Sequence, residues 1–204
     1  MFKSIESLPV CIVDDQLDEN YIDQLVLKSL ESGREDWQSR QVLTYSSLTE
    51  ALDLLEWDRP FLLILYHNME AGVDPGLAER LGANPEAFLF GYHLSKAIRQ
   101  QCKLGLVVPI VYLTAALPSV AKDPGKPDFI KLLMSDGPFL PDFWQDKHDY
   151  LTRKKKWSDL IEAMDSFYEM KLAQVQEVAA RVVWDSLELV GDDTPEGSEG
   201  DADA

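Results

Sequence analysis

The chain has 204 residues, of which 46% are hydrophobic and 10% aromatic, so it is long enough to bury a full core without disulfides. Its formal net charge of -17 argues against nucleic acid as a partner, because binding to a phosphate backbone depends on clustered Lys and Arg. A protein partner with a basic surface fits this charge better. The two cysteines, Cys11 and Cys102, lie far apart and form no metal-binding motif, which fits a reducing compartment.

The two ends of the chain give expectations about location and order. The first residues contain no run long enough for a secretory signal or a membrane span, because acids soon interrupt the apolar residues. We therefore expect a soluble, cytoplasmic protein without a membrane partner. Residues 191–204 contain six acids, no base and almost nothing apolar, so we expect a disordered acidic tail.

The first strand and helix are expected between residues 8 and 33. The run 8–13, LPVCIV, ends abruptly at Asp14 and Asp15, which is typical of a buried parallel strand whose carboxyl end opens at a site. Apolar residues then recur at helical spacing from Ile22 and stop near Gly33. This pattern predicts a crossover helix.

The next elements place a strand at the centre of the sheet. Residues 41–45 predict a second strand, and Ser47 with Glu50 three positions later predicts a capped helix start. The run 61–66, FLLILY, is apolar throughout and has the length of a strand that is covered on both faces.

A long connection over 67–85, with three glycines and two prolines, separates this strand from a helix expected at 85–101. The sequence LVVPIVYLTA then predicts a fourth strand. Residues 117–147 are rich in proline, and within them 129–134 predict one short helix. This segment is too apolar for a linker, so it is interpreted either as a lid or partner surface, or as a loop that packs on itself.

The last elements are a short fifth strand, expected around 149–152, and a long helix from Ser158 to about Leu189. A helix of about 30 residues reaches roughly 45 Å, which is more than a small sheet covers. Its second half therefore needs another surface, such as a second copy of the chain.

Strands that alternate with helices predict a doubly wound α/β fold with a five-stranded parallel sheet and an extended C-terminal helix. In this architecture the site lies at the carboxyl ends of the strands. On this prediction, chemistry is expected directly after Val13, Tyr66, Leu113 and Leu151.

Residues 8–168 resemble the receiver domain of bacterial response regulators, which has a flavodoxin-like, CheY-like fold. The resemblance rests on IVDDQ, LILYHNME, VYLTAAL and HDYLTRKKK at the four strand ends, and on GYHLSKAIRQ as the third helix. It implies an acidic pair that holds Mg²⁺, an aspartate that accepts the phosphoryl group, a Ser or Thr, and a Lys. Carboxylates suit Mg²⁺, while a hydroxyl and an ammonium stabilise phosphoryl oxygens.

The chain departs from this pattern at the acceptor. Alignment on the family motif puts Tyr66 in place of the aspartate and Glu70 in place of the usual proline. A phenol forms no acyl phosphate and offers the metal no carboxylate, so phosphotransfer by the usual route should be absent. The lysine position is taken by Arg153 and the following proline by Lys154, and these two cations are not equivalent in such a site. The degenerate phosphorylation pocket is thus predicted to contain Asp14, Asp15, Tyr66, Thr114, Arg153 and Lys154.

These expectations give a domain organisation and a leading function. A receiver-like domain at 1–168, with insertions at 68–84 and 117–148, is followed by a helical extension at 169–190 and the acidic tail. The leading hypothesis is a pseudo-receiver without catalytic residues, a phosphorylation-independent module of two-component signalling that binds proteins and forms a homodimer through its last helix. It needs no cofactor, although Asp14 and Asp15 leave weak Mg²⁺ binding open.

The sequence leaves two alternative functions open. In the first, Asp14, Asp15 and Glu70 bind Mg²⁺ for phosphoryl chemistry on a small substrate. In the second, the pocket left by the lost aspartate senses a small molecule. Tyr66 and Trp144 are candidates to fill that pocket with aromatic bulk, and His67 is interpreted as a partly exposed loop residue.

Overall fold

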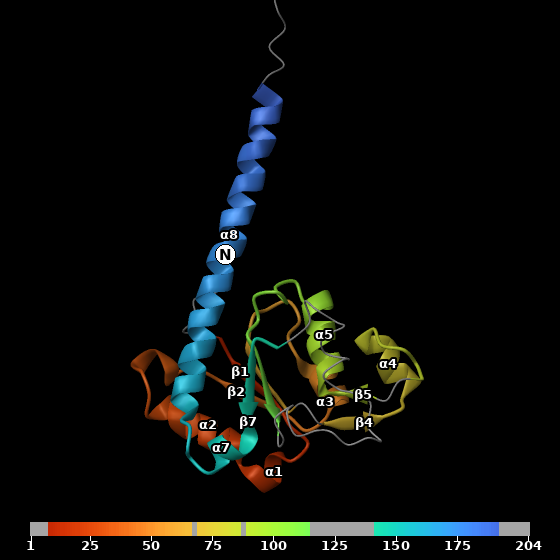
Figure 1. Ribbon diagram of the computed structural model, residues 1–204, viewed down its shortest axis with the longest axis vertical. Helices are drawn as coiled ribbons and strands as arrows, with labels where there is room; N and C mark the ends of the chain where they lie inside the picture. Colours follow the sequence, from red (N-terminus) through yellow and green to blue (C-terminus); the bar gives the residue numbers. More distant parts are fainter. Residues whose placement is uncertain (1–7, 67–68, 87–88, 115–140, 192–204) are drawn as a thin grey trace, which may run out of the picture.

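The computed structural model describes residues 8–66, 69–86, 89–114 and 141–191, with side chains described as far as Arg181 except that of Glu70 (Figure 1). Its centre is a five-stranded, wholly parallel sheet with strand order β2-β1-β3-β6-β7. The strands are β1 (Val10–Val13), β2 (Val42–Tyr45), β3 (Leu62–Tyr66), β6 (Ile110–Thr114) and β7 (Phe143–Asp146). This confirms the predicted fold class.

The burial of the strands explains their order. Every residue of β1, β3 and β6 is buried, as expected for continuous apolar runs in the middle of a parallel sheet. β2 and β7 lie at the two edges and are only partly buried. The chain therefore places its most apolar segments where helices cover both faces.

Helices lie on both faces of the sheet (Figure 1). One face is covered by α2 (Ile22–Glu31) and α8 (Trp157–Gly191), whose apolar residues pack with those of β1 and β6. The other face is covered by α3 (Leu48–Leu54) and α5 (Gly91–Gln101). Short helical turns, α1 (Leu17–Asn20), η2 (Glu35–Trp37) and α7 (Lys147–Leu151), complete the connections.

The predicted start of α3 is confirmed at the level of its cap. Ser47 Oγ accepts a hydrogen bond from the Glu50 backbone N–H at 3.1 Å. The Glu50 carboxylate in turn accepts from the Ser46 backbone N–H at 2.6 Å, one residue earlier than in the usual capping box. These bonds satisfy donors that the first turn of a helix leaves without intrahelical partners.

The connection after β3 is more ordered than the sequence analysis predicted. It contains β4 (Glu70–Gly72), α4 (Pro75–Leu81) and β5 (Leu89–Phe90), with β4 and β5 paired antiparallel. Asp74 caps α4, since its carboxylate accepts a hydrogen bond from the Leu77 N–H at 3.0 Å. The helix predicted from residue 85 begins only at Gly91.

The predicted fifth strand at 149–152 is wrong. Those residues belong to α7 and the turn after it, and the fifth strand is β7, which lies inside the segment interpreted as an insertion at 117–148. β7 pairs with β6 so that Thr114 is opposite Asp146. The residue that follows the fifth strand is consequently Lys147.

Helix α8 is fixed to the domain by a buried ion pair. Arg40 donates two hydrogen bonds to the Asp165 carboxylate, at 2.8 and 2.9 Å, and Trp37 Nε1–H donates a third at 3.0 Å. Beyond this anchor the helix continues to Gly191 and projects past the sheet (Figure 1). The predicted long helix is confirmed, although it starts at Trp157, so Ser158 lies within its first turn.

Some predictions fall outside the described residues. These are the short helix at 129–134, the loop residue His67 and most of the acidic tail. Among the helices that the structure describes, none combines the length and the apolar character required to cross a bilayer.

Candidate functional site

The carboxyl ends of β1, β3, β6 and β7 lie at the same end of the sheet. Four residues lie there, of which three are predicted from the sequence and one, Lys147, is not. Asp14 follows β1, Tyr66 ends β3, Thr114 ends β6 and Lys147 follows β7. Because parallel strands all end at the same edge, residues far apart in the sequence become neighbours there.

Asp14 is a buried carboxylate at the floor of this site. Its side chain is 1% exposed. Its backbone N–H donates a hydrogen bond to the Tyr45 carbonyl at 3.1 Å, which continues the pairing of β1 with β2. Oδ1 accepts a hydrogen bond from the Gln16 N–H at 2.8 Å. Oδ2 accepts no hydrogen bond of regular geometry from the described residues and is instead neutralised by an ion pair, which a buried charge requires.

The partner in that ion pair is Lys147. Its Nζ lies 2.7 Å from Asp14 Oδ2, and its side chain is 5% exposed. The same ammonium lies 3.4 Å from Gln16 Oε1. Strand β7 ends at Asp146 and α7 begins at Lys147, so the start of the helix fixes where the lysine stem leaves the backbone.

Tyr66 forms the third side of the site. It is the last residue of the central strand and is 9% exposed. The Lys147 ammonium lies over its ring, 4.0 Å from the centroid, which is a close cation–π contact. One buried cation therefore contacts both the carboxylate after β1 and the aromatic face at the end of β3.

Thr114, Asp15 and Trp144 complete the predicted set. Thr114 is 1% exposed at the end of β6, and Asp15 is exposed at the turn after Asp14. Trp144 lies beside Tyr112 within the sheet, with ring centroids 5.1 Å apart and nearly perpendicular. Its ring thus packs against a residue two positions before the strand end.

Arg153 and Lys154 do not directly follow the fifth strand, which is where the predicted pocket requires its cation. Both follow α7, and Arg153 has a left-handed backbone with φ of 58°. Lys154 is 65% exposed and pairs with Asp149 at 3.8 Å. The signal that points to Lys147 instead is the aromatic pair FW of an edge strand, followed directly by QDK.

The residues at the site do not fit a bound Mg²⁺ ion. Mg²⁺ requires several oxygen ligands in octahedral geometry. Both oxygens of Asp14 are engaged, one by the Gln16 N–H and the other by Lys147, and Tyr66 supplies no carboxylate. Within the part of the chain that the structure describes, no three His, Cys, Asp or Glu side chains converge on one point.

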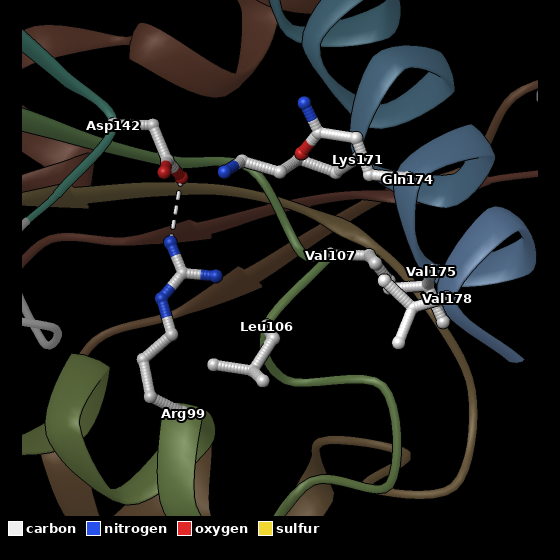
Figure 2. Close-up of a pocket in the computed structure, with 8 residues that line it drawn as sticks. All are labelled: Arg99, Leu106, Val107, Asp142, Lys171, Gln174, Val175 and Val178. Atoms are coloured by element: carbon white, nitrogen blue, oxygen red, sulfur yellow. Dashed lines mark hydrogen bonds and ion pairs between the residues drawn. The ribbon is translucent and has the colours of Figure 1, made fainter. Parts of the chain in front are cut away.

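A second feature is a groove of about 500 Å³ where α8 leaves the domain (Figure 2). Val175 and Val178 of α8 form one wall, and Leu106 and Val107 form the opposite one. Arg99 and Asp142 lie at its inner end, and Lys171 and Gln174 flank it.

The inner end of this groove is held by the Arg99–Asp142 ion pair. Arg99 Nη2 lies 2.6 Å from Asp142 Oδ2, and Nη1 donates to the Val108 carbonyl at 2.6 Å. Burial raises the pKa of the Asp142 carboxyl, against the lowering effect of Arg99. These contacts hold the loop before β6 in place, so the groove has a fixed polar end and apolar walls.

The comparisons with solved structures return receiver domains at low sequence identity. The CheY4 chemotaxis protein of Vibrio cholerae is 21% identical, with a TM-score of 0.42 over 72% of this chain and 91% of that one. A CheY-like receiver domain protein of Methanospirillum hungatei JF-1 is 12% identical, with a TM-score of 0.49 over 82% and 98%. A receiver domain protein of Clostridium thermocellum is 16% identical, with the same TM-score and coverage.

No family model and no curated protein matches the sequence. The assignment of the fold therefore rests on the strand order and the parallel register of this chain. A shared fold at such identity does not transfer binding or catalysis, which depend on the residues of the site.

Proposed function

We propose that the chain is an atypical, receiver-like signalling module that works without phosphorylation and without catalysis, through contacts with other proteins. The observation that supports this proposal is the contact of Lys147 with both Asp14 and Tyr66 at the end of the central strand. In the pattern that the sequence resembles, Tyr66 stands where an aspartate accepts phosphate.

The chemistry of these three side chains supports a site that stays in one state. A phenol forms no acyl phosphate, and the Lys147 ammonium is already engaged by a buried carboxylate. Phosphoryl oxygens would have to displace that ion pair and leave Asp14 without a counter-charge, which is costly at 1% exposure. The pocket is therefore closed by the chain's own side chains.

We further propose that a second copy of the chain covers the projecting half of α8. Ile161, Tyr168, Val175, Val182 and Leu189 recur in the sequence at intervals of seven residues. The first two are buried against the domain, whereas Val175 is 39% and Val178 is 62% exposed. An apolar stripe with this period is typical of helices that pair along their length.

The groove beside α8 supports the same occupant. Its walls combine the exposed Val175 and Val178 with Leu106, which is 65% exposed. A helix of a second copy that packs on this stripe would place apolar side chains between these walls and remove them from water. The gain is about 25 cal/mol for each Å² of apolar surface buried.

The test is the oligomeric state in solution. Sedimentation velocity of the full chain should show a dimer, and its fraction should not change when acetyl phosphate and Mg²⁺ are added. Val178→Glu should produce a monomer, because it places a charge in the apolar stripe. Ala173→Glu adds the same charge at an exposed position outside the stripe and should leave the dimer intact.

A monomeric wild-type chain would contradict the dimer. A dimer that forms or dissociates only after acetyl phosphate is added would contradict phosphorylation independence instead. The two parts of the proposal can thus fail separately.

A further inference from the structure

We infer that the Lys147 ammonium is a built-in counter-ion that replaces a divalent metal ion at the end of the sheet. The inference rests on the proposed function and deepens it, because it explains how the site remains in one state without a cofactor. It concerns three described residues, namely Asp14 after β1, Tyr66 at the end of β3 and Lys147 after β7.

The surroundings of Lys147 Nζ are those of a cation site. A carboxylate oxygen of Asp14 lies at 2.7 Å, the amide oxygen of Gln16 at 3.4 Å, and the ring centroid of Tyr66 at 4.0 Å. Two of these groups are oxygen donors of the kind that bind divalent cations, and the third is an aromatic face that prefers an organic cation. An ammonium makes use of all three groups, whereas Mg²⁺ can use only the two oxygens.

Asp14 can be neutralised by only one of these cations at a time. Its Oδ1 is occupied by the Gln16 N–H, and Oδ2 is the atom that meets Lys147. A metal ion bound at Oδ2 would lie close to the ammonium, and the repulsion between the two cations favours the presence of only one of them. The ammonium is covalently attached and 5% exposed, so it competes as an intramolecular partner at high effective concentration.

Removing the ammonium should therefore expose a latent cation site. Lys147→Met keeps an apolar stem of similar length but leaves the buried Asp14 carboxylate without its counter-charge, beside the exposed Asp15. A divalent cation that binds Asp14 in the folded state then stabilises that state by mass action. Stability becomes dependent on the metal only in the variant.

The experiment compares melting temperatures in EDTA and in millimolar MgCl₂ for three full-length chains. The wild type should melt at the same temperature in both buffers. Lys147→Met should melt lower in EDTA and recover part of the loss in MgCl₂. The double variant Asp14→Asn with Lys147→Met, which has neither charge, should melt above Lys147→Met in EDTA and show no response to MgCl₂.

Two results would overturn the inference. One is a wild-type melting temperature that rises with MgCl₂, with no such rise in the double variant. The other is a Lys147→Met chain whose melting temperature does not respond to MgCl₂. If that variant is unfolded in EDTA, the corresponding result is a helical circular dichroism signal that MgCl₂ does not restore. Neither result depends on dimer formation or on partner binding, so failure here is distinct from failure of the proposed function.

Discussion

Lys147 and Lys154 illustrate how strongly the energetic role of a lysine depends on its surroundings. Lys147 is 5% exposed and ion-paired at 2.7 Å, while Lys154 is 65% exposed and lies 3.8 Å from its acidic neighbour. A buried pair is expensive to break, because the remaining charge is left without a partner. An exposed pair contributes little, because water and salt screen it.

Alanine substitution of the two lysines should separate these cases. In the absence of divalent cations, Lys147→Ala should lower the free energy of unfolding by about 3–5 kcal/mol, as for other buried pairs that lose one partner. Lys154→Ala should change it by less than about 1 kcal/mol. Urea unfolding measures both, and equal effects would show that Lys147 is not the buried partner of Asp14.

The buried thiol of Cys11 predicts how stability depends on alkaline pH. Burial raises its pKa from 9.0 to about 12. Because the pKa is higher in the folded state, the contribution to stability is complete below pH 9.0 and is lost as the pH rises toward about 12. The wild-type free energy of unfolding should therefore fall between about pH 9 and about pH 12.

The matched variant for this prediction is Cys11→Ala. It should be less stable at every pH, because it leaves a cavity, but its stability should fall less steeply over the same range. A slope identical to that of the wild type would show that the thiol does not contribute. Comparing slopes also removes the contribution of buried tyrosines such as Tyr150, whose pKa is likewise raised to about 12.

At the level of single residues, sequence reasoning identified the acidic and aromatic parts of the site but not its cation. Asp14, Tyr66 and Thr114 follow or end fully buried strands, so a continuous apolar run marks each position. Lys147 follows an edge strand that is only half-buried and has no such run. The motif HDYLTRKKK therefore predicts Arg153 and Lys154 in the site, whereas Lys147 is the residue that follows the fifth strand.

Among the elements, α8 depends on one polar anchor within its apolar face. Asp165 accepts hydrogen bonds from Arg40 and Trp37, and the Arg40 side chain is 0% exposed. Burial raises the pKa of the Asp165 carboxyl, although Arg40 opposes that shift. The register of the long helix on the domain is thus set by a directional contact as well as by packing.

Loss of this anchor should be costly. Asp165→Ala leaves the Arg40 guanidinium buried without a counter-charge and should lower the free energy of unfolding by about 3–5 kcal/mol. Glu169→Ala, an exposed acid on the same helix, should change it by less than about 0.5 kcal/mol. Combining Asp165→Ala with Arg40→Met should restore much of the lost stability, since no unpaired buried charge remains. Denaturant unfolding measures all of these variants. A double variant as unstable as Asp165→Ala alone would contradict the role of the ion pair as an anchor.

The elements that sequence reasoning predicted well are those with strong periodicity. The strands around residues 10–13, 42–45, 62–66 and 110–114 and the long last helix have clear patterns, and they lie where expected. The short pieces β4, α4 and β5 are not predicted because glycines and prolines interrupt their segment and leave no clear periodicity. A closer reading finds one signal there, since Asp74 before Pro75 is a typical helix start.

For the whole molecule, the proposal describes a closed receiver-like domain that presents a long helix. The parallel sheet brings Asp14, Tyr66 and Lys147 together, and their mutual contacts leave the central strand end without a free carboxylate acceptor among the described residues. In this proposal, the net charge of -17 and the exposed Val175 and Val178 of α8 favour contacts with other proteins. Sequence alone indicates the charge and the stripe, whereas the closure of the site requires the structure.

The most direct test of the central claim is the intact mass of the full chain after incubation with acetyl phosphate and Mg²⁺. We expect no change in mass, because Tyr66 offers no carboxylate and Lys147 remains paired with Asp14. A gain of one phosphoryl group that hydroxylamine removes, as it does an acyl phosphate, would contradict the account, since it would reveal a carboxylate acceptor in this chain.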